Sequence, residues 1–251
     1  MKNLFVDLNS DLGEGAGHDE EILGLVTSAS IACGFHAGNP DSIFKSILAA
    51  KEKGVAVGAH PSFDDRKNFG RSEIQISATE AYALVAYQIG AFRAVCVAAG
   101  VEMNHVKPHG ALYNMAVRDQ TLADAIAHAI LAVDSKLILF ASPASYLEAA
   151  ALKLDLQTAS EVFADRNYNA DGSLVSRSNR NAMLHDPIAA ADRVVRMLRE
   201  GVVRALDGTD VRISAETICV HGDSPGAVEF VRELRQRLEL EEVTIAAPAK
   251  K

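Results

Sequence analysis

The sequence lacks any excess of positive charge. Its 251 residues include 25 Lys and Arg against 33 Asp and Glu, which gives a formal net charge of −8 at pH 7. Proteins that bind nucleic acid usually carry a basic balance or a basic patch. We therefore expect no nucleic-acid partner for this chain.

Long hydrophobic runs are also missing. No stretch of ~18 apolar residues free of charge occurs, which is the length that a membrane span needs. The start, MKNLFVDLNSDLGEG, reaches acidic residues before any apolar run long enough for a signal peptide. We therefore expect a cytoplasmic protein without a membrane span.

Closely paired cysteines and the common catalytic motifs are absent as well. The three cysteines, Cys33, Cys96 and Cys219, lie far apart and are typical of buried small side chains, not of a zinc site. Neither G-x-x-x-x-G-K-[ST] nor G-x-G-x-x-G occurs, so a self-contained ATP or dinucleotide site of the common kinds is not expected. The absence of G-x-S-x-G leaves Ser-His-Asp hydrolysis without support.

What the sequence does contain is a regular alternation of short apolar runs with longer amphipathic stretches. The length suits either one α/β barrel or two small domains. Repeated strand-helix units predict a parallel sheet, which is open or closed into a barrel. The candidate strands are residues 4–9, 28–34, 54–60, 102–109, 136–142, 156–164 and 217–223.

Several helix starts are marked by capping residues. Asn39-Pro40, Asp186-Pro187 and Ser224-Pro225 each place a capping side chain before a proline at the first helical position. Ser77 and Glu80 predict a capping box for a long helix that runs toward Gly100.

Two features favour closure of the sheet into one barrel. No linker or low-complexity tract divides the chain, so we expect a single domain over residues 1–251, with residues 246–251 as a frayed tail. In GVAVGAH, at 54–60, two valines alternate with Ala56, Gly58 and His60. Side chains alternate across a strand, so the small set can fill a narrow barrel interior while the valines pack under helices.

Polar residues gather where the candidate strands end. In parallel α/β barrels the active site lies at the carboxyl ends of the strands. The first strand carries Asp7, Asn9 and Asp11, which share one face at a spacing of two. The other strand ends supply His36, His60, Lys107, His109, Glu161, Asp165, Arg166, His221 and Asp223.

Each of these residues also has a purely structural interpretation. A single histidine near a strand end is more often a hydrogen-bonded structural residue than a catalyst, although four at equivalent ends favour a site. Asp7 or Asp11 alone would also serve to cap a turn. Lys107 is more telling, because a lysine that faces inward needs a partner such as Glu161 or Asp11 to keep its proton.

Residues 7–17, DLNSDLGEGAG, combine acids with glycines and so admit two interpretations. Glycine-rich turns after strands often cradle phosphate, but Asp7, Asp11 and Glu14 would repel it unless a cation intervened. The second interpretation is favoured, in which the glycines let the chain turn sharply and bring Asp11 and Glu14 over a pocket.

Three further interpretations concern residues near these strand ends. We expect a structural role for His105 and a carboxylate clamp at Arg71, and we interpret Asp165 with Arg166 as a local ion pair.

Six stretches, taken in chain order, resemble the signatures of the LamB/YcsF family: DLNSDLGEG, SIACGFHAGNP, GVAVGAHPSFDDRKNFGR, VKPHGALYN, EVFADRNY and CVHGDSPGAV. The resemblance runs from about Val6 to about Leu238, and its small departures at Ser30, Asn39 and Asp64 replace no histidine, lysine or strand-end acid. It implies a seven-stranded parallel (β/α) barrel, TIM-barrel-like, of the glycoside hydrolase and polysaccharide deacetylase superfamily.

The resemblance also implies a reaction. Members of this family are understood as the A component of a prokaryotic ATP-dependent 5-oxoprolinase, which opens 5-oxo-L-proline (pyroglutamate) to L-glutamate as ATP is hydrolysed. It implies ATP, with Mg²⁺, as co-substrate and the separate B and C subunits as partners. The missing nucleotide motifs fit a nucleotide site that depends on those partners.

Such a reaction needs a base, a cation for oxyanion charge and a donor for the substrate carboxylate. We assign Asp11 or Glu161 as base, Lys107 as the electrostatic group and His109 as acid or phosphate contact. The expected substrate-binding residues are Asn9, Glu14, His36, His60, Arg71, His221 and Asp223.

Two rival functions are compatible with the same residues. A ring of histidines and acids at one mouth would suit a metal-dependent deacetylase or amidohydrolase, and the residues leave open whether a metal is bound. Alternatively, the chain is a non-catalytic subunit that binds the substrate and delivers it to partners.

Overall fold

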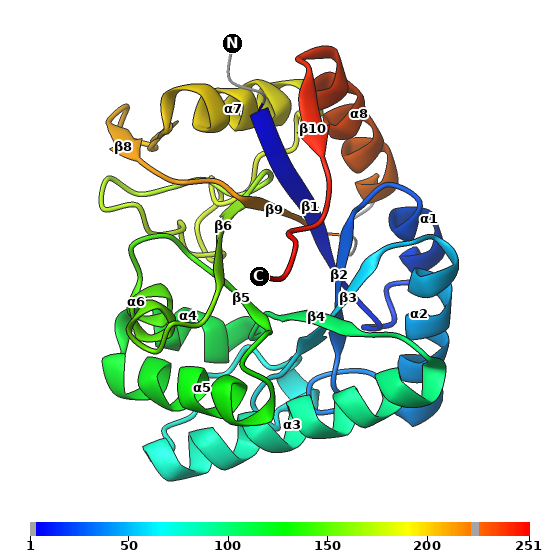
Figure 1. Cartoon of the computed structure of the whole chain (residues 1–251). Coiled ribbons are helices and arrows are strands. Elements are labelled where there is room, and N and C mark those ends of the chain that lie inside the picture. The colour runs from blue at the N-terminus through cyan, green and yellow to red at the C-terminus, as the bar shows by residue number, and fades with distance from the viewer. Residues whose placement is uncertain (1–3, 222–225) are drawn as a thin grey trace.

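The computed structural model, which describes residues 4–221 and 226–251, is a closed parallel barrel surrounded by helices (Figure 1). Neighbouring strands are hydrogen-bonded in the order β1-β2-β3-β4-β5-β6-β9, and the pairing of β9 with β1 closes the ring. The predicted seven-stranded barrel is confirmed. Its strands are β1 (Leu4–Leu12), β2 (Ser28–Ala32), β3 (Ala56–His60), β4 (Met103–Val106), β5 (Ile138–Ala141), β6 (Thr158–Phe163) and β9 (Thr217–Val220).

Helices cover the outside of the barrel, as the amphipathic stretches predicted. They are α1 (Asp19–Leu23), α2 (Pro40–Glu52), α3 (Ala78–Ala99), α4 (Gly110–Arg118), α5 (Gln120–Val133), α6 (Tyr146–Lys153), α7 (Pro187–Glu200) and α8 (Ala227–Leu240), with a 3-10 turn, η1, at Arg66–Asn68. Three smaller strands join them: β7 (Val202–Arg204) and β8 (Asp210–Arg212) form an antiparallel hairpin, and β10 (Val243–Ile245) pairs with the start of β1.

Capping chemistry begins these helices where the sequence predicted it. The Asn39 side chain accepts a hydrogen bond from the backbone N–H of Ser42, and Ser77 with Glu80 forms the capping box of α3. The Asp186 carboxylate accepts from the first backbone N–H groups of α7. The predicted cap at Ser224-Pro225 lies outside the described residues.

Among the described residues, α3 alone is long and apolar enough to cross a membrane by length and composition. Length therefore does not by itself exclude a span, contrary to the expectation from the sequence. In this structure the buried side of α3, which includes Val85, Ile89 and Phe92, packs into the hydrophobic core. A core helix of a barrel meets the same criteria, because it needs a long apolar stripe.

The barrel interior is filled by inward-facing side chains of alternating size. His105 is fully buried there, where its ring stacks on Phe140 at 4.1 Å between centroids and one nitrogen lies 3.1 Å from Ser30 Oγ. Gly58 faces this ring: a Cβ added to Gly58 would lie 2.2 Å from His105. A glycine on β3 therefore makes room for a histidine on β4, which gives His105 the structural place that its spacing predicted.

Gly58→Ala should accordingly destabilise the fold. The added methyl group has no space unless His105 and Phe140 move, and overpacking of this kind typically costs ~1–3 kcal/mol. Gly90→Ala is the matched control, since Gly90 lies inside α3 with nothing within 4 Å of an added Cβ. It should stabilise by about 0.5–1 kcal/mol through helix propensity. Urea unfolding measures both, and equal free energies of unfolding for the two variants would contradict the tight contact.

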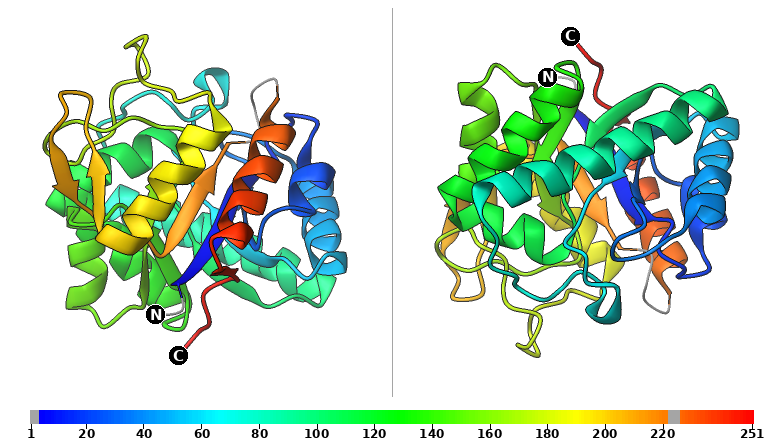
Figure 2. Two further views of the ribbon diagram at one scale, coloured as in Figure 1. Left: turned by 90° about the horizontal axis from the view of Figure 1, so that it is seen from above. Right: turned by 90° about the horizontal axis from the view of Figure 1, so that it is seen from below.

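The two ends of the barrel are closed differently. Figure 2 shows the carboxyl-terminal tail at one end, and the long segment between β6 and α7 together with the loop after β3 at the other. The tail 246–251, expected to fray, makes hydrogen bonds at the amino-terminal end of the strands. Asn104 Nδ2 donates to the carbonyl of Pro248 at 3.2 Å, and Gln157 Nε2 donates to that of Ala249 at 2.8 Å. The carboxyl end of the barrel is left to the polar residues.

Candidate active site

A cavity of about 750 Å³ opens at the carboxyl ends of the strands. Its wall contains most of the predicted site residues, namely Asp11, Glu14, His60, Arg71, Lys107, His109 and His221. Asn9, His36 and Glu161 are buried and contact these residues. Asp223 lies outside the described residues. The strand ends that the sequence indicated thus meet at one mouth.

Lys107 lies in a cage of acceptors. Its Nζ donates to Asp11 Oδ1 at 2.8 Å, to Glu161 Oε1 at 2.8 Å and to Asn9 Oδ1 at 3.1 Å, and it lies 3.1 Å from Cys219 Sγ. Both carboxylates named as alternative partners from the sequence are therefore partners together. The side chain of Lys107 is only 3% exposed, so these contacts replace its hydration.

The charges in this cage hold one another ionised. Burial lowers the pKa of Lys107, but Asp11, Cys219 and Glu161 outweigh burial and raise it well above its ordinary value. Burial likewise raises the pKa of Asp11, yet His60 and Lys107 lower it well below the ordinary value. At neutral pH the cage therefore contains an ammonium group beside ionised Asp11.

Two polar atoms near the cage are unpaired within the described part of the chain. Glu161 Oε2 and the Tyr113 hydroxyl are buried and make no hydrogen bond. Buried polar atoms without a partner are uncommon, and they mark places where water or a ligand is bound. Glu161 Oε2 is thus available to accept a proton or a hydrogen bond from a molecule in the site.

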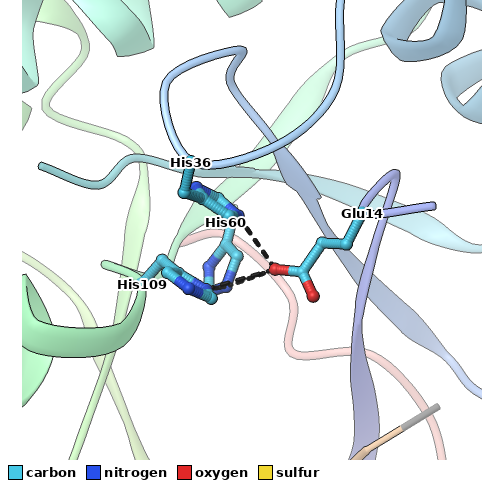
Figure 3. A group of neighbouring side chains, drawn as sticks. All are labelled: Glu14, His36, His60 and His109. Atoms are coloured by element: carbon cyan, nitrogen blue, oxygen red, sulfur yellow. Dashed lines mark hydrogen bonds and ion pairs between the residues drawn. The ribbon is translucent and has the colours of Figure 1, made fainter. Parts of the chain in front are cut away.

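A second cluster, which we call the histidine cluster, consists of Glu14, His36, His60 and His109. The three rings surround the Glu14 carboxylate (Figure 3), whose Oε1 lies 2.9 Å from His36 Nε2 and 3.2 Å from His109 Nδ1. His60 Nε2 lies 2.8 Å from His109 Nδ1 and 3.4 Å from Asp11 Oδ2. Asp11 therefore joins the histidine cluster to the lysine cage.

Glycines in the neighbouring loops make this arrangement possible. Gly13 and Gly15, at φ 73° and 84°, turn the chain after β1 so that Glu14 reaches the histidines. Gly70 has φ 65°, and a Cβ there would lie 2.8 Å from His109 and 2.9 Å from His36. The turn expected of the residues 7–17 segment is confirmed, and here its product is an acidic contact to histidines.

The pKa values in the histidine cluster move in opposite directions. Burial raises the pKa of Glu14, but the hydrogen bonds from His109 and His36 lower it to about 2. Burial lowers the pKa of His36 to about 4. For His60 the burial effect is outweighed by Asp11, which raises its pKa. The cluster therefore contains an ionised glutamate and a neutral His36 at pH 7.

His221 lies in the same cavity wall with a different set of partners. Its Nδ1 is 2.7 Å from Asp165 Oδ2, and its Nε2 is 3.0 Å from Arg177 Nη2. The expected ion pair of Asp165 with Arg166 is not what the structure shows, because Asp165 turns to His221 and Arg166 donates to the carbonyl of Val175 at 2.7 Å. The pairing with a strand-end histidine wins because both groups face the cavity end of the barrel.

Asp7 shares the face of Asn9 and Asp11 but lies deeper. Its carboxylate is fully buried and accepts hydrogen bonds from Thr27 at 2.6 Å, Ser28 at 2.8 Å and Thr217 at 2.5 Å. Burial raises its pKa to about 6. It supports the barrel interior and does not line the cavity.

Three residues near the site were not found from the sequence. Cys219 was interpreted as a simple buried side chain, although Thr217, Cys219 and His221 follow the period of two that marks the inward face of β9. Tyr113 lies on α4 beside Glu161, and Arg177 reaches the site from the segment between β6 and α7. No periodic signal in the sequence marks either of these last two.

Comparison with known proteins decides the family. The model of the LamB/YcsF family matches residues 6–251. The chain belongs to the LamB/YcsF family. It is 50% identical over 247 residues to the A chain of 5-oxoprolinase from Bacillus licheniformis, covering 96% of this chain and 98% of that protein. The corresponding protein of Bacillus subtilis is 48% identical over 247 residues, with 96% of each chain covered.

Solved structures support the same family and fold. A lactam utilization protein from Thermus thermophilus superposes with a TM-score of 0.92 at 47% identity, covering 98% of this chain and 100% of that one. A family 4 carbohydrate esterase from Streptomyces lividans reaches a TM-score of 0.53 at 14% identity, covering 98% of this chain and 94% of that one. The second likeness is one of fold alone.

Proposed function

We propose that this member of the LamB/YcsF family is the A component of an ATP-dependent 5-oxoprolinase. The reaction opens the lactam of 5-oxo-L-proline to L-glutamate while ATP is cleaved to ADP and phosphate. The observation that carries the proposal is the identity of about half of all residues to proteins of that name, over 96% of this chain and 98% of its relative from Bacillus licheniformis. We further propose cytoplasmic action together with the B and C subunits, with Mg²⁺ accompanying ATP.

The lysine cage suits the chemistry of this reaction. A lactam is a resonance-stabilised amide, so its carbonyl must be activated before water attacks. Transfer of the γ-phosphoryl group to the lactam oxygen supplies that activation; water then adds to the ring carbon, the C–N bond breaks and phosphate leaves. The Lys107 ammonium lies where it would stabilise charge that develops on oxygen.

The other roles follow from protonation and access. Asp11 is ionised, and Glu161 has a free oxygen within the described chain, so either carboxylate can take the proton of the attacking water. We assign His109 as the acid or phosphate contact, while Arg71, in the cavity wall, is suited to the substrate carboxylate. The proposed substrate pocket is completed by Asn9, Glu14, His36, His60, His221 and Asp223.

A coupled assay tests the proposal. The purified chain is incubated with 5-oxoproline and ATP, with and without the B and C subunits, and glutamate and ADP are measured together. We expect both products in equal amounts and only in the complete mixture. Glutamate formed without ATP or partners would contradict the proposal and favour a simple amidohydrolase.

A variant of His109 separates a catalytic subunit from one that only delivers substrate. His109→Ala, assayed in the complete complex, should lower glutamate formation by about 10²–10⁴-fold, the usual contribution of a general acid. If the proposed acid role is wrong, the variant keeps the wild-type rate. Loss of substrate binding with unimpaired partner ATPase activity would instead indicate a subunit that delivers 5-oxoproline.

A further inference from the structure

We infer that the histidine cluster is a binding site for a divalent metal ion of the zinc class. Each of its four residues offers one ligand atom, and these atoms all lie within 4.8 Å of one another. Three imidazoles and one carboxylate are a common ligand set for zinc. The inference is independent of the proposed function, because metal binding is measured without turnover.

The outer hydrogen bonds of the rings direct bare nitrogen atoms inward. His60 Nδ1 lies 2.6 Å from the carbonyl of Lys107, and His109 Nε2 lies 2.9 Å from the carbonyl of Phe69. Carbonyl oxygens only accept, so each of these nitrogens carries the proton. His60 Nε2 and His109 Nδ1 then present lone pairs to each other across 2.8 Å.

His36 follows the same pattern. Its Nδ1 lies 2.9 Å from Ser62 Oγ, which itself donates to the carbonyl of Phe63 and therefore accepts from the ring. His36 Nε2 is then bare and faces Glu14 Oε1. Metal-binding histidines characteristically donate their other ring N–H to such a partner, which fixes the tautomer and the ring orientation.

The inward arrangement thus brings four acceptors together. One shared proton between His60 and His109 would satisfy only that pair and would leave the contacts of Glu14 Oε1 without a hydrogen. Protonation of both His36 and His109 is disfavoured, because their rings stack in parallel with centroids 3.7 Å apart. One cation at the centre satisfies all four acceptors at once.

The spacing fits a tetrahedral ion. Zinc–nitrogen bonds of about 2.0–2.1 Å place neighbouring ligand atoms about 3.3–3.4 Å apart. The distances from Glu14 Oε1 to the nitrogens of His36, His109 and His60 are 2.9, 3.2 and 3.7 Å. An ion there would lie in the cavity wall, and His109 would then be a ligand, so its role as acid applies to the metal-free chain.

A second group of potential ligands, Asp11, Cys219 and His221, is the weaker site. The ammonium group of Lys107 contacts both Asp11 and Cys219 there, at 2.8 and 3.1 Å. A metal cation in that group would be repelled by the lysine. The two groups differ chemically, because only the second contains sulfur.

Metal binding to the full chain tests the inference. After chelation and dialysis, zinc uptake is measured by elemental analysis, and cobalt binding by its visible absorption. We expect about one ion per chain, and ligand variants His36→Gln, His109→Gln and Glu14→Gln should bind more than about 100-fold more weakly. Ser62→Ala should weaken binding by about 10–100-fold, because Ser62 only orients His36. His128→Gln, at an exposed position on α5, is the matched control and should bind like the wild type.

Two results would overturn the site. One is a folded, stripped wild-type chain, verified by circular dichroism, that takes up no zinc. The other is metal binding by the ligand variants as tight as that of His128→Gln. If the variants do not fold, X-ray absorption of the zinc-loaded wild type decides: nitrogen and oxygen neighbours at about 2.0–2.1 Å support the histidine cluster, and a sulfur neighbour would place the ion at Cys219 and contradict it.

Discussion

Lys107→Met should abolish most activity and also destabilise the protein strongly. Methionine keeps the length of the side chain but removes the ammonium charge that offsets Asp11 and Glu161 in the cage. Removing one partner of a buried ion pair typically costs ~3–5 kcal/mol of folding free energy, since it leaves a buried charge unpaired. Loss of an electrostatic donor at an oxyanion typically lowers kcat by about 10²–10³-fold. Urea unfolding and the coupled assay with the B and C subunits measure the two effects.

Two control variants separate charge loss from other damage. Lys45→Met removes a lysine whose partner, Asp41, is as close at 2.7 Å, but both side chains are more than two-thirds exposed, at 72% and 75%. It should cost at most ~1 kcal/mol. The double variant Lys107→Met with Glu161→Gln should recover much of the lost stability and none of the activity. If Lys107→Met unfolds at the same urea concentration as Lys45→Met, the cage does not hold buried charges.

Asp7→Asn should make the protein more stable at neutral pH. Burial raises the pKa of Asp7 from 3.8 to about 6, so the folded state binds its proton more tightly than the unfolded chain does. Stability due to this group is therefore present below about pH 4 and is lost as the pH rises through 6. The difference of roughly two pKa units corresponds to about 3 kcal/mol. Urea unfolding from pH 3.5 to 7.5 should show the two proteins diverging between about pH 4 and 6.

Glu14→Gln supplies a comparison of opposite sign. The pKa of Glu14 is lowered from 4.5 to about 2, so its contribution is present above pH 4.5 and is lost as the pH falls toward 2. Unfolding is measured with a chelator present, so that metal binding does not enter. A wild-type protein that gains stability relative to Asp7→Asn as the pH rises from 4 to 6 would show that the three hydroxyl donors to Asp7 outweigh its burial.

Much of the fold could be predicted because its signal is local. All seven barrel strands overlap the predicted runs, since β-branched residues with a period of two mark a strand that is buried on both faces. The errors lie at the boundaries and in short elements. Strand β1 continues to Leu12 because Asp11 still pairs with Ser30 of β2, while β4 ends at Val106 before the proline at 108. The three-residue strands β7, β8 and β10 are too short to show any period.

The site could be predicted as a set of strand ends but not as contacts. Period-two spacing placed Asn9 and Asp11 on one face, and the need of a buried lysine for an acid named both partners of Lys107. The division into a lysine cage and a histidine cluster depends on neighbours around the barrel and on loop turns. Glu14 joins His36 only because of two glycines at positive φ, and a single sequence contains no distance between strand ends.

The pairing of β1 with strands from both ends of the chain bears on how the protein is made. Its first residues pair with β10 and the rest with β2 and β9, and the hydrogen bond from Thr217 to Asp7 joins residues 210 positions apart. During synthesis β1 is therefore the first strand to leave the ribosome and the last to complete its pairing. Such long-range closure slows folding and leaves a strand edge open to other chains in the meantime. The lysine cage, which needs Cys219 and Asp11 together, forms only when nearly the whole chain has been translated.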